Sequence, residues 1–232
     1  MHEALEQELH LERDWFFFLN GSDSQYWDSF FYIYSLIGTW IVLYLCFIVV
    51  FVYKRPWKEV VCTLLAVALV IAVCDQVTSS VFKPVFHRFR PTHHPDFENL
   101  VDTVKDYRGG LYGFISGHAA NSFGIATFAT LVFRNRLFTA SILTFAVLNA
   151  YSRIYLGVHF ISDIAAGALL GVLAGYLGYL FMNFLRAKWV KVDKSELQKP
   201  LFPARTATAL SAIYGIHLLF LLAFSNQIIK FL

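Results

Sequence analysis

The chain has 232 residues, of which 57% are hydrophobic and 15% are charged, and its net charge at pH 7 is +3. A soluble domain carries about 25% charged residues, and binding to nucleic acid needs a concentrated basic surface. The composition therefore argues against a soluble domain and against a nucleic-acid partner.

The first 28 residues are polar and then aromatic. The opening "MHEALEQELHLERDW" is acidic where a cleaved signal peptide is basic, so no signal peptide is indicated. The stretch that follows predicts an amphipathic helix in the membrane interface, with Trp15, Phe16 and Leu19 in contact with lipid. We expect residues 1–28 to form an interfacial segment and residues 29–232 to form the membrane domain.

Long apolar runs dominate the rest of the chain. Residues 29–53 contain no formal charge and are long enough to cross the hydrocarbon core, which takes about 20 helical residues. The further runs are 58–82, 118–133, 137–158, 160–185 and 206–229. These runs predict an all-α integral membrane protein, a bundle of about six transmembrane helices. The three cysteines fall inside them and have neither zinc-binding nor disulfide spacing.

Basic residues are concentrated in alternate connections. The connections 54–58, 134–136 and 186–205 hold 11 of the 19 lysines and arginines. With six spans these connections share one side, which the positive-inside rule makes cytoplasmic. Both termini and the 83–117 loop then face outward.

Three polar stretches share that outward side: "KPVFHRFRP" at 83–91, "YGFISGHAAN" at 112–121 and "SRIYLGVHFISD" at 152–163. Charged groups at a membrane boundary are costly unless they are paired or functional. Pro84 disfavours helix at the residue before it, so the second span is predicted to end near Lys83.

These stretches hold the parts of a phosphoryl-transfer site. Lys83, Arg90 and Arg153 supply positive charge, and guanidinium groups match phosphate oxygens. Ser116 and Gly117 stand at a helix start, where free N–H groups favour an anion.

Two histidines add proton chemistry. His118 and His159 can exchange protons near neutral pH, and His159 lies four residues before Asp163, so on a helix the two would share one face. An aspartate at one imidazole nitrogen leaves the other nitrogen free to attack. No cluster of carboxylates accompanies these groups, so we expect neither a metal nor another cofactor.

The spacings Lys-x6-Arg-Pro (83–91), Ser-Gly-His (116–118) and Ser-Arg-x5-His-x3-Asp (152–163) resemble the three-part signature of the type 2 phosphatidic acid phosphatase superfamily. The resemblance covers about residues 29–185. It implies a six-span, metal-independent lipid phosphatase, related in its site to vanadium haloperoxidases. One departure is Ile115, where the family usually has proline before Ser-Gly-His. We expect that change to alter the loop rather than abolish catalysis.

The resemblance also implies roles. His159 corresponds to the nucleophile that forms a phosphohistidine, Asp163 to the residue that orients it, and His118 to the acid that protonates the leaving oxygen. The implied phosphate cradle consists of Lys83, Arg90, Ser116, Gly117 and Arg153.

Three further polar residues are candidates for supporting roles. Asp75 lies two helical turns before Lys83 and could pair with Lys83 or with a motif arginine. His87 and Arg88 lie inside the first motif and could hold a second phosphate or a sugar, or remain in a solvated loop.

The predicted function is hydrolysis of a lipid phosphate at the outer face of a bacterial inner membrane. The candidate substrates are undecaprenyl diphosphate, lipid A phosphate, phosphatidylglycerol phosphate and phosphatidic acid, with a lean to the first two. The partners are this lipid and the bilayer, and nothing in the sequence indicates an oligomeric state.

Three alternatives differ in class. A proton-relay transporter predicts ionisable residues through the membrane depth, whereas here they gather at one side apart from Asp75. The related haloperoxidases are soluble, which argues against redox use of the site. A catalytically silent lipid-phosphate binder is the third alternative.

Overall fold

The computed structural model describes residues 12–232, and within that range the chain is helical and contains no strand. One isolated bridge pairs Phe89 with Tyr112. The main helices are α2 (Gln25–Ser35), α3 (Ile41–Val52), α4 (Trp57–Gln76), α5 (Lys83–Phe86), α6 (Gly117–Phe133), α7 (Arg136–Tyr155), α8 (Ile161–Leu185), α9 (Lys194–Leu197) and α10 (Ala204–Ile228). Short 3₁₀ or π-helical turns are η1 (Ile37–Trp40), η2 (Val77–Phe82), η3 (Pro91–His93), η4 (Glu98–Leu100), η5 (Arg186–Val190) and η6 (Ile229–Phe231).

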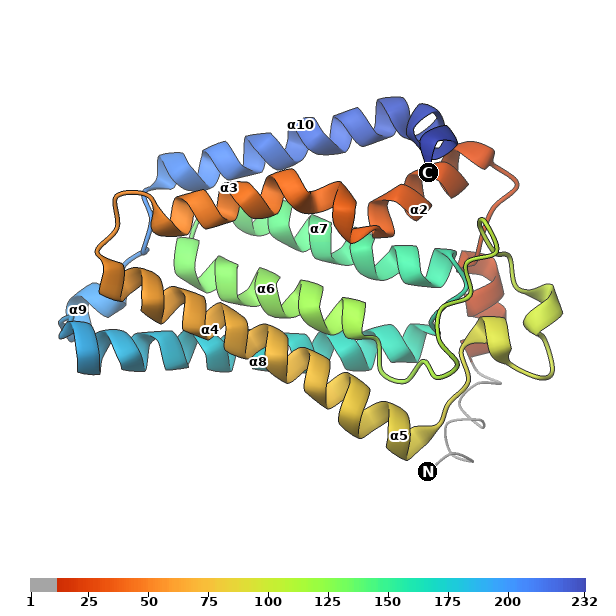
Figure 1. The fold of residues 1–232 in the computed structure, drawn as a ribbon, viewed down its shortest axis with the longest axis horizontal. Coiled ribbons are helices and arrows are strands. Elements are labelled where there is room, and N and C mark those ends of the chain that lie inside the picture. Colours follow the sequence, from red (N-terminus) through yellow and green to blue (C-terminus); the bar gives the residue numbers. More distant parts are fainter. Residues whose placement is uncertain (1–11) are drawn as a thin grey trace.

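The long helices run side by side in alternating directions, and α6 lies in the middle of the bundle (Figure 1). Four helical stretches are long and apolar enough to cross a membrane: Trp57–Phe86, Arg136–Tyr155, Ile161–Val190 and Ala204–Phe231. The pair Gln25–Ser35 and Ile37–Val52 makes a fifth if it counts as one span, but it is bent by 71°. Helix α6 has 17 residues, fewer than the about 20 that cross the hydrocarbon core. The all-α, multi-pass architecture is confirmed, and the count of about six spans is not.

The first predicted span is broken. Leu36 adopts an extended conformation (ψ 132°) between α2 and η1, so the run 29–53 is not one straight helix. Side chains satisfy the carbonyls that the break leaves free: Trp40 Nε1 donates to the Tyr34 carbonyl at 2.8 Å and Thr39 Oγ1 donates to the Ile33 carbonyl at 2.6 Å. Because backbone polar groups in lipid need internal partners, these bonds make the bend tolerable at membrane depth.

Pro84 does not end the second helix, contrary to expectation. The helix continues through η2 and α5 to Phe86 and ends at His87, which has a left-handed conformation (φ 48°). Proline lacks an N–H and crowds the carbonyl one turn earlier, and the π-helical turn η2 already interrupts the α-helical bonding at that place. Lys83 therefore projects from a helix.

Glycines bring α6 and α8 into close contact. A Cβ at Gly167, Gly171 or Gly175 would lie 2.4, 2.3 or 2.4 Å from a backbone carbonyl oxygen of the segment from Ser116 to Gly124. Small residues at a helix contact allow such an approach in membranes. Where the two helices begin, this contact places the Ser116 nitrogen 3.0 Å from the Asp163 carbonyl oxygen.

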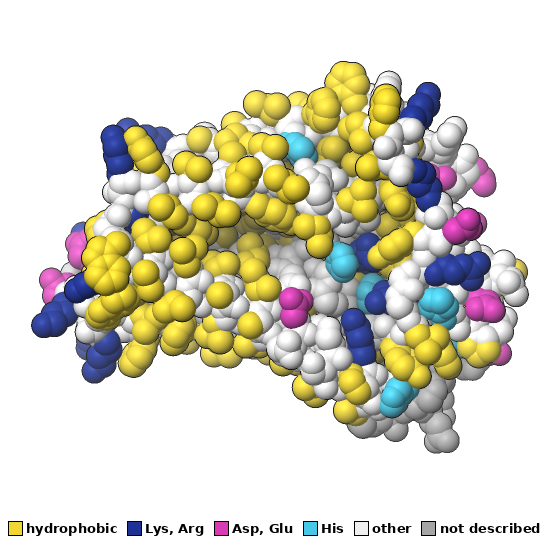
Figure 2. Space-filling model, in the orientation of Figure 1, with side chains coloured by type: hydrophobic (Ala, Val, Ile, Leu, Met, Phe, Trp, Pro, Cys, Tyr) yellow, Lys and Arg dark blue, Asp and Glu magenta, His cyan; other side chains and the backbone are white. Residues whose placement is uncertain are grey.

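The two ends of the bundle differ. The loop that joins α5 to α6 and the helix at residues 12–19 lie at one end, and the connections before α4, α7 and α10 lie at the other (Figure 1). Lysine and arginine side chains lie at both ends in Figure 2, and those of the connections 54–58, 134–136 and 186–205 lie at the second end. A buried ion pair joins α4 to η5 there, with Arg186 Nε 2.7 Å from Glu59 Oε2.

The helix at residues 12–19 packs partly on protein. Trp15 and Phe18 are 65% and 79% exposed, which fits contact with lipid or water. Phe16 is fully buried, against Phe97 and Phe160, so the expectation that it contacts lipid is wrong. Leu19 packs against the same cluster. The part of the predicted interfacial segment at residues 1–11 lies outside the described residues.

Candidate active site

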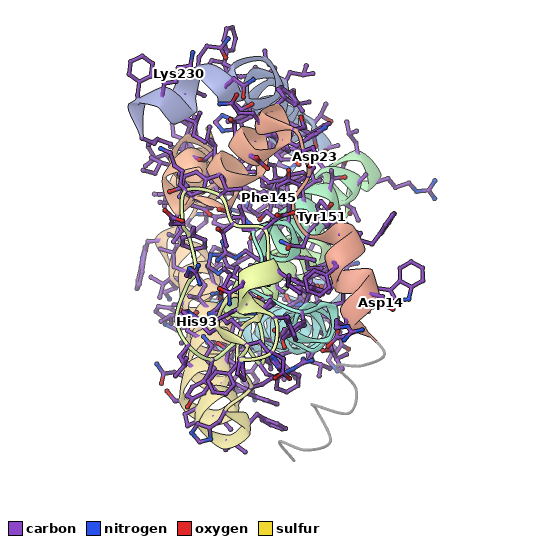
Figure 3. All side chains as sticks on the ribbon, turned by 90° about the vertical axis from the view of Figure 1, so that its right-hand side faces the viewer. Asp14, Asp23, His93, Phe145, Tyr151 and Lys230 are labelled. Atoms are coloured by element: carbon purple, nitrogen blue, oxygen red, sulfur yellow. The ribbon has the colours of Figure 1, made fainter. Side chains whose placement is uncertain are left out.

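The three motif stretches meet at the end of the bundle that holds the long loop. Figure 3 views this end, with His93 of the loop facing the reader. Lys83 comes from α5, His118 from the first turn of α6, Arg153 from the last turn of α7 and Asp163 from the first turn of α8. The antiparallel course of the helices therefore brings residues 80 positions apart to one place.

A buried hydrogen-bonded pair forms the centre. His159 Nδ1 lies 3.2 Å from Asp163 Oδ2, and the two residues are 1% and 0% exposed. The pair does not share a helix face as expected, because His159 precedes α8. Asp163 is the third residue of α8, and its carboxylate also accepts the Phe160 N–H at 3.0 Å, in the manner of a helix cap.

The hydrogen bonds define which imidazole nitrogen carries the proton. Arg90 Nη1 lies 2.9 Å from His159 Nε2 and donates to the Val158 carbonyl at 2.8 Å. A guanidinium can only donate hydrogen bonds, so Nε2 of His159 is the acceptor. Nδ1 therefore carries the proton and donates a hydrogen bond to Asp163. The lone pair of Nε2 consequently faces the cationic side of the site.

The imidazole is held neutral. Burial lowers the pKa of His159 well below its usual value, and the nearby positive charges of Arg90 and Arg153 lower it further. Burial and Arg153 also lower the pKa of Arg90, which stays protonated because arginine starts from a pKa above 12.

Arg90 and Arg153 have N–H groups that form no hydrogen bond with the described residues. Arg153 Nη2 donates to the Tyr107 hydroxyl at 2.7 Å and its guanidinium lies 5.2 Å from that ring. The Nε atoms of Arg90 and Arg153 are buried and lack a partner among the described residues, as does that of Arg88. Buried donors normally have partners, so unused N–H groups beside His159 are suited to an anion.

The N-terminus of α6 adds neutral donors. Ser116 caps the helix, with Oγ accepting the Ala119 N–H at 3.4 Å, and it is fully buried. The free N–H groups of the first turn and the helix dipole both favour negative charge. His118 lies in that turn and is half-buried. Ile115, in place of the family's proline, is buried directly before the cap.

Arg88 has different neighbours from those expected. Its side chain is fully buried, with Nη1 2.9 Å from Asp163 Oδ1 and 2.6 Å from Ser162 Oγ. Nη2 pairs with Glu12. The guanidinium is therefore committed to carboxylates, and a contact with a second phosphate or a sugar does not fit this placement.

Asp75 and His87 lie at the edge of the site. Asp75 accepts a hydrogen bond from Asn121 Nδ2 at 2.7 Å, and among the described ion pairs it has neither Lys83 nor an arginine. His87 is exposed and its ring packs against Tyr112, with ring centroids 4.9 Å apart. No sequence pattern indicates Glu12, Tyr107 or Asn121, because their partners lie 76, 46 and 46 positions away.

One face of the bundle is hollowed. Figure 2 shows a hollow on the face where α3 and α4 flank α6, lined mainly by hydrophobic side chains. Histidine and basic side chains gather at the end of the hollow nearest α5. Such a hollow suits a molecule with an apolar body and an anionic head.

The comparisons with known proteins agree with this chemistry. Residues 59–187, which include all three motifs, match the model of the PAP2 superfamily. The chain therefore belongs to the PAP2 superfamily.

Three similar proteins indicate which class of enzyme this chain is. The lipid A 4'-phosphatase of Porphyromonas gingivalis is 45% identical over 186 residues, which are 80% of this chain and 79% of that protein. The lipid A 4'-phosphatase of Bacteroides thetaiotaomicron is 37% identical over 172 residues, 74% of this chain and 76% of that protein. The crystal structure of Aquifex aeolicus LpxE superposes with a TM-score of 0.55 at 29% identity, covering 72% of this chain and 94% of that one. This chain is a multi-pass membrane lipid phosphatase.

Proposed function

We propose that this phosphatase removes the 4'-phosphate of lipid A through a phosphohistidine on His159. The observation that carries the mechanism is the buried pair of His159 and Asp163, with the Nε2 lone pair directed at Arg90. The choice of lipid A is supported by the two relatives of that name, which align over 80% and 74% of this chain.

The first step transfers the phosphoryl group to the protein. The negative charge of the bound phosphate offsets Lys83, Arg90 and Arg153, so His118 takes up a proton when the lipid binds. Nε2 of His159 attacks phosphorus, the bond from phosphorus to the sugar oxygen breaks, and His118 gives that oxygen its proton. The lipid leaves with a hydroxyl group. Asp163 stabilises the positive charge that develops on the imidazole.

The second step uses water. A water molecule attacks phosphorus while His118, now neutral, takes its proton; the bond from phosphorus to Nε2 breaks and inorganic phosphate leaves. Lys83, Arg90, Arg153, the hydroxyl of Ser116 and the N–H group of Gly117 bind the equatorial oxygens in both steps. Preorganised donors contribute most where charge grows in the transition state.

The position of the site fits a lipid substrate. The acyl chains lie in the apolar hollow between α3 and α4, and the phosphate reaches the cations at its end. The basic connections lie at the opposite end of the bundle, which by the positive-inside rule supports a site at the periplasmic face of the inner membrane.

The direct test measures phosphate release by the purified protein in detergent with EDTA. The panel contains lipid A bisphosphate, its 1- and 4'-monophosphates, undecaprenyl diphosphate, phosphatidylglycerol phosphate and phosphatidic acid. We expect EDTA-resistant release from the bisphosphate and the 4'-monophosphate, and none from the 1-monophosphate.

Three variants complete this test. His159→Ala abolishes release, and Asp163→Asn lowers kcat by about 10⁴-fold, the order of loss seen when an orienting aspartate is replaced. His93→Ala, in the loop at the same end, is the matched control and keeps wild-type turnover. Release from another lipid alone would reassign the substrate, and normal release by His159→Ala would remove the proposed mechanism.

A further inference from the structure

Arg88 lies between two carboxylates from distant parts of the chain. Its fully buried guanidinium pairs with Asp163 Oδ1 at 2.9 Å on one side and with Glu12 on the other. The ring of Phe160 covers one face of the guanidinium at 4.5 Å. Asp163, the partner of His159, is thus connected to the helix at residues 12–19.

Glu12 also contacts the start of α8. Its Oε2 accepts the Ser162 N–H at 2.9 Å and its Oε1 accepts the Ser162 hydroxyl at 2.8 Å. A carboxylate at the N-terminus of a helix binds free N–H groups and stabilises the helix dipole. A single side chain therefore fixes both Arg88 and the helical turn that carries Asp163.

We propose that Glu12 is a positioning residue for the nucleophile, acting on His159 through Arg88, Ser162 and Asp163. This inference rests on the proposed role of His159. Glu12 does not face the phosphate cradle, and its effect on the reaction comes from geometry and charge.

The charge of Glu12 acts on the step that forms the phosphohistidine. If Arg88 paired with Asp163 alone, the two charges would cancel and the imidazolium would face a neutral pair. With Glu12 ionised, the three groups carry one net negative charge beside the imidazole. That charge offsets the cations that the phosphate needs.

The charged and titratable groups that face His159 are Lys83 from α5, Arg90 from the loop after it, His118 from α6, Arg153 from α7 and Asp163 from α8.

The test compares three substitutions of Glu12 with one control on the same helix. Glu12→Gln keeps the shape and removes the charge, Glu12→Asp keeps the charge, and Glu12→Ala removes both. Asp14→Asn is the matched control, because Asp14 is exposed on that helix and faces away from the bundle (Figure 3). Steady-state kinetics on the best lipid of the panel and thermal midpoints in detergent are measured for all four.

We expect Glu12→Gln to lower kcat by about 10- to 100-fold with KM nearly unchanged, the range found when a partner that orients a reacting ligand is removed. Glu12→Asp recovers part of this loss, and Asp14→Asn behaves as wild type. The acid limb of the kcat profile moves to lower pH in Glu12→Gln, because removing a negative charge disfavours protonation of His159. A merely destabilised protein would instead lose activity sooner on acidification.

Wild-type kcat and pH profile in both Glu12→Gln and Glu12→Ala would overturn the inference. So would a loss of kcat that follows the thermal midpoint across all variants, or equal activity of Glu12→Gln and Glu12→Asp. Wild type and His159→Ala are measured in the same assay. Normal turnover by His159→Ala would contradict the proposed function itself. An inactive His159→Ala together with a fully active Glu12→Gln would contradict the positioning role alone.

Discussion

At the scale of single residues, the decisive feature is an imidazole that stays neutral although an aspartate touches it. An aspartate alone would favour the protonated form, but burial and the charges of Arg90 and Arg153 lower the pKa of His159 more strongly. A neutral imidazole keeps its lone pair, so Nε2 can attack phosphorus once the bound lipid displaces the hydrogen bond from Arg90.

The protonation state of His159 can be observed directly. In ¹⁵N-histidine NMR of the protein in detergent, the signal that disappears in His159→Ala should show a proton on Nδ1 only, at neutral pH and on acidification to the ordinary histidine pKa of about 6.5. The sign for stability follows: below about pH 6.5 the unfolded chain binds a proton that the folded chain refuses, so acidification destabilises the fold. A doubly protonated His159 between pH 6 and 7 would be the contrary finding.

At the scale of elements, the contact between α6 and α8 positions the cap at Ser116 against Asp163. The contact depends on glycines whose Cβ positions are occupied by backbone of the facing helix. The helix pair therefore cannot separate without moving the phosphate cradle from the nucleophile.

Gly171→Ala should lower both stability and turnover. The new Cβ would lie 2.3 Å from the Ala120 carbonyl oxygen, and overpacking of this kind costs about 1–3 kcal/mol. Gly215→Ala is the matched control: nothing lies within 4 Å of its Cβ, and alanine is the better helix former by about 1 kcal/mol. Thermal midpoints in detergent compare the two, and equal midpoints would show that the close contact is not needed.

Sequence patterns anticipated the helices better than their irregularities. Apolar runs predicted the helices, because length and hydrophobicity are local properties of the chain. The break at Leu36 and the continuation past Pro84 depend on tertiary bonds and on a π-helical turn, and no local pattern encodes either one.

The residues of the site were also only partly predictable from local sequence patterns. The three motifs named the residues that meet at one end, whereas Glu12 could not be found from the sequence. Its partner Arg88 is 76 positions away, and a glutamate in an acidic N-terminal stretch resembles any solvated charge. Arg88 itself looked like a headgroup contact because sequence alone does not show on which side of a loop a side chain is buried.

At the scale of the whole molecule, the two ends of the bundle carry different chemistry. One end holds the basic connections and the other holds the catalytic candidates, and an apolar hollow on one face of the bundle extends toward the second of these ends (Figure 2). This polarity fits an enzyme that takes a lipid from the side and releases phosphate into water.

The orientation can be tested with single cysteines. With Cys46, Cys62 and Cys74 replaced by alanine, Asp96→Cys marks the site end and Lys194→Cys marks the opposite end; both positions are exposed. In spheroplasts a membrane-impermeant maleimide should label position 96 at once and position 194 only after lysis. The reverse pattern would place the site in the cytoplasm.

The most direct test of the central claim is to trap the intermediate. Wild-type protein is mixed with ³²P-labelled lipid A, quenched in alkali within milliseconds to preserve phosphohistidine, digested and sequenced by mass spectrometry. We predict a phosphoryl group on His159, absent in His159→Ala and formed more slowly in His118→Ala, where the leaving oxygen receives no proton from the protein. A phosphoryl group on another residue, or turnover with none on the protein, would contradict the account.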